Sequence, residues 1–414
     1  MRSLKINFIW SFAGNAFSAL SMWLLLVLIT KLDSPRTVGV FGMGQAIALP
    51  VNMFFGLKLL FVQVTDAGDK YTLGQYLSVK LISMVGSMIV TTLIGLILYD
   101  RETALVTILL GFGYSVVSLK EIYIAIMQKN ERMDYASISK IIEGITTLIS
   151  FGLIFYLFKN LIYSITSMAF IRIAIMLIYD IPVAKKVLEI DGIGNIIKPS
   201  CDSKNIFKLV FETLPLGFVA LLGSLFTSMP RLFLDGYRGK NHVGYFVAMS
   251  SLLVASSMIV NAMSQTVSPR LAVYYQKNKK QFRILLTKLL ILGLLIGTSS
   301  VVAGVLVGEY FLTLVFSKEY SSYNNVLVLL LVAGSMQILF TFMIVGLTAA
   351  RIFTIQLPLF MLCVSVVVIV SFILVPRYGM HGAAISLISC YSIGFFGSTM
   401  ALISKWSDPV KVDT

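Results

Sequence analysis

Apolar runs of about 20 residues recur along the whole chain, and they limit what it can fold into more than any other feature. A helix needs about 20 residues to cross the hydrocarbon core of a bilayer, where every backbone amide must be hydrogen-bonded within the protein. Only 13% of the 414 residues are charged, against roughly 25% in a soluble domain. The sequence therefore predicts an all-α membrane protein.

The apolar runs predict about twelve membrane-spanning helices in two lobes of six. A short motif supports the division, because VGVF at 38–41 opens the second span and VGYF at 243–246 opens the eighth. Six spans per lobe give both lobes the same orientation, which predicts pseudo-two-fold symmetry about an axis along the membrane normal. The expected domains are an N-lobe at 1–190, a cytoplasmic linker at 191–210 and a C-lobe at 211–414. The predicted spans are 8–32, 38–61, 79–98, 104–127, 141–158, 161–181, 211–234, 244–266, 285–308, 324–347, 357–375 and 383–404.

Basic residues gather on one side of this predicted topology. With the N-terminus inside, 21 of the 33 Lys and Arg residues fall in cytoplasmic connections, and 8 fall in outer ones. Because cytoplasmic loops of membrane proteins are enriched in Lys and Arg, both termini are expected in the cytoplasm. The same distribution explains the net charge of +14 without nucleic acid as a partner.

Besides lysines at span ends such as Lys80, which are counted above with the connections, four cations fall inside predicted spans, where a charge is costly unless it meets a carboxylate, an anionic ligand or water. They are Lys58, Lys120, Arg172 and Arg231. Arg172 lies near the middle of its span, too deep for its side chain to reach the interface easily. We expect these four residues to make a substrate cavity cationic. For Lys58 and Arg231, which lie nearer span ends, a side chain that extends to the interface is the alternative.

Polar side chains form stripes on one face of several predicted helices. Between residues 250 and 264, serines and an asparagine are spaced seven, four and three residues apart, which places them on one face. Such a stripe is costly against lipid and predicts a cavity lining, although the same residue types also hydrogen-bond neighbouring helices. The amide residues predicted to line the cavity are Asn15, Gln45, Asn52, Asn261 and Gln265.

Four carboxylates lie within or beside the spans: Glu121, Glu143, Asp180 and Glu212. Glu143, Asp180 and Glu212 fall near predicted inner helix ends, which favours capping or surface roles; a negative charge suits a helix N-terminus. The alternative is a gate or ion-coupling site in which one of these carboxylates pairs with Lys58 or Lys120.

Motifs of enzyme catalysis are absent from the sequence. It contains no GxxxxGK[ST] phosphate loop, no HExxH and no GxSxG. Both histidines fall in predicted outer loops, and the three cysteines show no paired spacing. We therefore expect no enzyme activity, cofactor or metal, and a transport step driven by an ion gradient (H⁺ or Na⁺) or by the substrate's own gradient.

Five segments, in order along the chain, carry a resemblance to a known family. They are NFIWSFAGNAFSALSMWLLLVLITKLDSP at 7–35, QKNERMDYASIS at 128–139, YDIPVAKK at 179–186, MPRLFLD at 229–235 and SPRLAVYY at 268–275. Together they resemble the O-antigen unit flippases, or Wzx proteins, of the multidrug, oligosaccharidyl-lipid and polysaccharide exporter superfamily. The resemblance covers nearly the whole length.

The resemblance implies a V-shaped arrangement of two six-helix lobes in the bacterial inner membrane. It also implies a flippase that moves an undecaprenyl-diphosphate-linked oligosaccharide, an O-antigen or related repeat unit, to the periplasmic leaflet by alternating access. A cationic central cavity belongs to this expectation, and Arg231 in MPRLFLD is the first residue carried over. Leu60 differs from the family pattern, in which the residue at this position is often basic. The expected partners are the lipid-linked oligosaccharide, the bilayer, a coupling ion, a polysaccharide polymerase and a chain-length regulator.

Two other functions remain open at this point. A multidrug cation exporter of the same fold predicts buried carboxylates at mid-membrane. A non-transporting scaffold for glycan-assembly enzymes predicts that reversing the charge of Arg231 leaves surface glycan intact. A membrane glycan polymerase is disfavoured, because the longest predicted outer loop, 308–323, is small.

Overall fold

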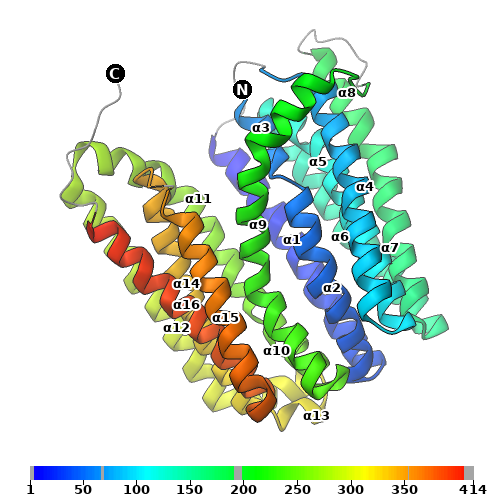
Figure 1. The fold of residues 1–414 in the computed structure, drawn as a ribbon, viewed down its shortest axis with the longest axis vertical. Coiled ribbons are helices and arrows are strands. Elements are labelled where there is room, and N and C mark those ends of the chain that lie inside the picture. Colours follow the sequence, from blue (N-terminus) through cyan, green and yellow to red (C-terminus); the bar gives the residue numbers. More distant parts are fainter. Residues whose placement is uncertain (1–3, 67–69, 191–197, 353, 405–414) are drawn as a thin grey trace. The chain divides into compact units, whose positions relative to one another are not determined.

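The computed structural model describes residues 4–66, 70–190, 198–352 and 354–404 (Figure 1). All regular structure in these ranges is helical, with no β-strand. The chain divides into two compact units, Met1–Ser228 and Met229–Thr414, and the division falls inside one long helix. The lobes predicted at 1–190 and 211–414 therefore remain a prediction, and 191–197 of the predicted linker lies outside the described residues.

The first unit contains the helices up to the middle of α9. They are α1 (Leu4–Leu32), α2 (Pro35–Phe55), α3 (Leu59–Thr65), α4 (Leu73–Leu98), α5 (Arg101–Lys129), α6 (Met133–Phe158), α7 (Leu161–Ile175), the π-helix η1 (Met176–Asp180), α8 (Ile181–Ile190) and the first part of α9 (Ser203–Arg238). The second unit contains the rest of α9, α10 (Lys240–Ser251), α11 (Leu253–Lys277), α12 (Lys279–Val315), α13 (Lys318–Ser321), α14 (Asn324–Ala349), α15 (Gln356–Tyr378) and α16 (Met380–Ser404).

Eleven helices in the described ranges are long and apolar enough to cross a membrane, and they coincide with eleven of the twelve predicted spans. The exception is the predicted eighth span, 244–266. This segment forms two helices, α10 and α11, which meet at Leu252. α10 has only 12 residues, and the break divides the polar stripe, with Ser250 on α10 and Ser257, Asn261 and Ser264 on α11. The polar residues that suggested a cavity thus also make this the least apolar of the predicted spans.

Capping residues make several helices longer than the apolar runs alone indicate. Thr72 caps α4 by accepting the backbone N–H of Gln75, while the Gln75 side chain accepts the backbone N–H of Thr72. α4 therefore begins at Leu73 instead of residue 79. This earlier start places Lys80 about two turns inside the helix instead of in its first turn, and Lys80 is 2% exposed.

The second predicted span is broken into α2 and α3 by a short left-handed turn. Leu57 and Lys58 have φ of 51° and 49°, a conformation that is uncommon for residues other than glycine. The carbonyl of Gly56 in this turn accepts a hydrogen bond from Lys80 Nζ at 3.4 Å. The same carbonyl accepts the backbone N–H of Leu59 at 3.1 Å, so Lys80 adds a second hydrogen bond to it at the helix break.

Small residues let α1 and α6 approach closely in the first unit. A Cβ atom added to Gly14 would lie 2.9 Å from Ser137 Cα, and one added to Gly144 would lie 2.6 Å from Ser21 Oγ. Close approach of this kind is how membrane helices gain packing energy without a hydrophobic driving force. This pairing holds the α1 and α6 residues of the candidate site next to each other.

Gly14→Val is expected to lower the free energy of unfolding by about 1–3 kcal/mol, because the added atoms collide with the α6 backbone. Gly236→Val is the matched control, since a Cβ at Gly236 on α9 meets nothing within 4 Å. Thermal unfolding of both purified variants in detergent checks the difference. Equal melting temperatures would contradict the close α1–α6 contact.

Candidate functional site

Lys120 is the centre of a buried group of charges in the first unit. It lies on α5, about 14 Å from the end of the helix at Lys129 at a rise of 1.5 Å per residue. Its Nζ is 2.5 Å from Glu143 Oε2 on α6 and 3.4 Å from Asp180 Oδ2 at the end of η1. Lys120 is 1% exposed, so both carboxylates meet it away from solvent.

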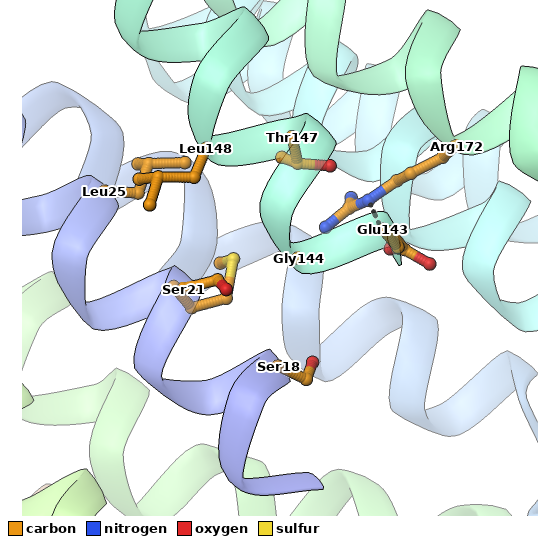
Figure 2. A pocket seen from close by; sticks show the side chains of 9 residues that line it. Ser18, Ser21, Leu25, Glu143, Gly144, Thr147, Leu148 and Arg172 are labelled. Atoms are coloured by element: carbon orange, nitrogen blue, oxygen red, sulfur yellow. Dashed lines mark hydrogen bonds and ion pairs between the residues drawn. The ribbon is translucent and has the colours of Figure 1, made fainter. Parts of the chain in front are cut away.

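Arg172 on α7 completes this group, which we call the charge cluster (Lys120, Glu143, Arg172 and Asp180). Its Nε donates to Glu143 Oε1 at 3.1 Å, and its guanidinium lies 5.9 Å from the ring centre of Tyr114. Gly113 makes room for it, because a Cβ there would lie 2.9 Å from Arg172 Nη1. Figure 2 shows the guanidinium extending from α7 toward Glu143 and the space beside α1.

The π-helix η1 positions the last member of the cluster. In η1 the backbone N–H of Ile181 bonds to the carbonyl of Met176, a wider turn than that of an α-helix. Single π-turns within α-helices occur frequently at functional sites. Asp180, the last residue of η1, is 0% exposed and faces Lys120. The two cations and two carboxylates balance formally, which is what a low-dielectric interior requires of buried charge.

A small cavity of about 30 Å³ lies against the cluster. Glu143 and Arg172 form one side of it, and the hydroxyl-bearing residues Ser18, Ser21 and Thr147 form the other (Figure 2). Apolar side chains of Met22, Leu25 and Leu148 complete the wall. Such a space holds one or two water molecules, and it is far too small for a sugar. The cluster therefore has a polar cavity beside it within the first unit.

A second buried pair extends the polar region toward the turn between α2 and α3. Lys80 Nζ lies 2.8 Å from both Glu121 Oε2 and Ser118 Oγ. The sequence analysis placed Lys80 in a cytoplasmic connection and missed this role. The sequence signal for this role was the capping motif of Thr72 and Gln75, because the motif starts α4 at Leu73, before Lys80.

The structure corrects the interpretation of two carboxylates. Glu143 and Asp180 were expected to be capping or surface charges, but both form ion pairs inside the first unit. The alternative of a Lys120–Asp180 pair matches the observed contact. Glu212 is exposed as expected, and accepts two hydrogen bonds of 2.8 Å from Lys70 and one of 2.8 Å from the Tyr71 hydroxyl. The hydrogen bond to Glu212 raises the pKa of the Lys70 ammonium.

The remaining predicted cations are not part of the cluster. Lys58 is exposed in the turn between α2 and α3. Arg231 is half-buried on α9 in the second unit, within electrostatic range of Tyr391 on α16. Whether these residues contact substrate stays a prediction.

The predicted polar lining is dispersed. Asn52 joins α2 to α5: it donates to the carbonyls of Ala48 and Gly111 and accepts from the Ser115 hydroxyl at 3.0 Å, as expected of a helix-to-helix contact. Asn15 is exposed on α1 and accepts from Lys140 at 2.8 Å. Gln45 is half-buried. The side chains of Asn261 and Gln265, on α11, lie outside the described residues.

Comparisons with known proteins find a family model and a related protein that match this chain. A family model described as "Polysaccharide biosynthesis protein" matches residues 4–275. The capsular polysaccharide biosynthesis protein CapF of Staphylococcus aureus is 31% identical over 392 residues, which cover 92% of this chain and 94% of CapF.

Among solved structures, the lipid II flippase MurJ in an inward closed conformation matches with a TM-score of 0.75 at 14% identity. The match covers 97% of this chain and 88% of MurJ. An inward-facing multidrug resistance transporter of the MATE family has a TM-score of 0.67 at 14% identity over 97% of this chain and all of the transporter. At this identity the likeness shows the fold alone. The prediction of an all-α membrane fold is confirmed.

Proposed function

Because the chain belongs to the polysaccharide biosynthesis protein family, we propose that it moves an undecaprenyl-diphosphate-linked oligosaccharide from the cytoplasmic to the periplasmic leaflet. A flippase for lipid-linked polysaccharide is the general function that the family and the fold support. The substrate is an O-antigen or related surface repeat unit. The protein acts by alternating access in the bacterial inner membrane, with both termini in the cytoplasm.

The observation that carries this proposal is the charge cluster inside the membrane-spanning helices of the first unit. A diphosphate cannot enter a low-dielectric region without compensating positive charge, and arginine offers it two parallel hydrogen bonds. Arg172 and Lys120 are held in place by carboxylates. Exchange of Glu143 for phosphate oxygens would let Arg172 bind the lipid head, and the negative charge that the diphosphate adds to the balanced cluster would be offset by a proton or Na⁺ at the carboxylates.

The carboxylates then provide the coupling site. When Arg172 turns to the substrate, Glu143 keeps only Lys120, which it shares with Asp180. One lysine between two carboxylates favours the binding of a proton or Na⁺. In this scheme Glu121 holds Lys80 at the edge of the cluster, and Glu212 holds Lys70. Lys58 and Arg231 are proposed as further phosphate contacts, and the amide residues as sugar contacts.

A multidrug cation exporter is the second candidate, and one observation favours it. That function predicts carboxylates buried at mid-membrane; Asp180 is buried and Glu143 is partly buried, and both lie within candidate spans. Their pairing with Lys120 and Arg172 favours the flippase, because an exporter of organic cations needs carboxylate charge that its own cations have not already neutralised.

Deletion of the gene tests the proposed function. We expect lipid-linked repeat units to accumulate on the cytoplasmic leaflet and surface polysaccharide to disappear, and a plasmid copy to reverse both effects. Arg231→Glu in that copy separates the flippase from the scaffold, because a scaffold tolerates the reversal. Unchanged lipid-linked pools together with increased sensitivity to cationic drugs would instead identify an exporter.

A further inference from the structure

Basic residues gather at one end of the second unit, where α12 begins. Lys279, Lys280, Arg283 and Lys288 line an open pocket of about 640 Å³ there, together with Ile284 and Thr287. Lys280, Arg283 and Lys288 are exposed and lie within the first ten residues of the helix. We call this surface the α12 basic pocket.

No carboxylate of the second unit lies near this pocket in the sequence. Between Asp235 and Glu309 the chain contains no Asp or Glu, while it contains Arg270, Lys277 and the four basic residues of the pocket. Glu309 is close to the other end of α12, and Glu319 on α13 bonds to Tyr245.

The pocket lies where a bilayer places its phosphates. α12 has 37 residues and is about 55 Å long, so it extends well beyond a hydrocarbon core of about 30 Å. Beyond Ile284 in the pocket, its exposed large apolar side chains run from Ile291 to Leu314, about 35 Å, and the buried residues in this stretch are Gly293, Gly297, Gly304, Gly308 and Leu312. Lys288 precedes this apolar stretch by about one helical turn. The basic pocket therefore adjoins a lipid-facing surface at headgroup depth.

We propose that the α12 basic pocket binds the phosphate headgroup of an anionic phospholipid of the surrounding leaflet, with the acyl chains against the apolar face of α12. Four cations and the N-terminus of a long helix complement a phosphate, and Ile284 and Thr287 contact the glycerol region. On the predicted topology this leaflet is the cytoplasmic one. Basic residues that only orient the protein in the membrane require no pocket and no preference among lipids.

Native mass spectrometry of the full-length protein, with phosphatidylglycerol or phosphatidylcholine added, tests this site. We expect phosphatidylglycerol to bind preferentially, and Lys280→Gln/Arg283→Gln to weaken its apparent affinity about thirtyfold, with less effect at high salt. The matched control is Lys185→Gln/Lys186→Gln, which removes two exposed lysines from α8 and should leave the affinity unchanged.

Three results would overturn the proposal: equal binding of both lipids, equal weakening by both double variants, or binding of inorganic pyrophosphate at this pocket without binding of phosphatidylglycerol. The last result would assign the pocket to the diphosphate of a substrate instead of a membrane lipid. Because lipid binding is measured without transport, a failure here leaves the proposed flippase function untouched.

Discussion

Lys120→Met is expected to lower the free energy of unfolding by about 3–5 kcal/mol, because it leaves Asp180 buried without its cation. The cost arises from the uncompensated charge and not from lost packing, since methionine is close to lysine in size. Lys120→Met/Asp180→Asn should therefore recover much of the loss, although it removes two charged groups. In that variant Glu143 still pairs with Arg172.

Lys70→Met is the matched control for this prediction. Lys70 also bonds to a carboxylate, that of Glu212, but both groups are exposed. Solvent screens a pair of this kind, so the variant should unfold almost like the unaltered protein. Thermal unfolding in detergent measures all three variants. If the double variant is less stable than Lys120→Met alone, the Lys120–Asp180 pair does not exist as described.

Arg172→Gln is expected to reduce transport at least about tenfold while the protein still folds. Glu143 keeps its bond to Lys120 in this variant, so its charge stays compensated. The variant loses the guanidinium of the cluster and its hydrogen bonds to the substrate. Because a hydrogen bond between charged groups contributes about 1.5–3 kcal/mol, this loss should lower transport at least about tenfold. Surface polysaccharide in complemented cells measures the effect, with membrane levels of the protein as the check on folding.

Arg132→Gln provides the comparison for Arg172. Arg132 also bonds to a carboxylate, that of Asp134, but it lies between α5 and α6, outside the candidate spans. We expect nearly normal transport from it. Equal loss of transport in both variants would mean that any arginine ion pair of the first unit is needed for folding, and that Arg172 has no special part in binding.

Most of the architecture could be predicted from the sequence, because apolar runs of the length of a bilayer have few alternatives. Eleven predicted spans overlap their helices, which extend beyond the predicted ends by up to eight residues. The prediction of one continuous eighth span was wrong. A polar stripe gives the same sequence pattern in a cavity-lining helix and in a segment that breaks at Leu252. The start of α4 was missed because its cap and first turns are polar.

The candidate site was only partly predictable. Arg172 and Lys120 were found because charge inside an apolar run is conspicuous. Glu143 and Asp180 were assigned to helix ends because their nearest partners are 23 residues or more away in sequence, and sequence gives no register between helices. The π-turn that directs Asp180 toward Lys120 has no sequence signal that we could read.

Reconstitution into liposomes tests transport by this protein most directly. Vesicles that contain the purified chain and an undecaprenyl-diphosphate-linked oligosaccharide are treated with a glycosidase from outside, and the fraction of substrate that becomes accessible is followed over time. We predict that all of the substrate becomes accessible with the unaltered protein, at least about tenfold more slowly with Arg172→Gln, and that only the outer-leaflet half becomes accessible with empty vesicles. Equal accessibility in all three preparations would contradict a role for the buried cations in carrying the lipid head across the membrane.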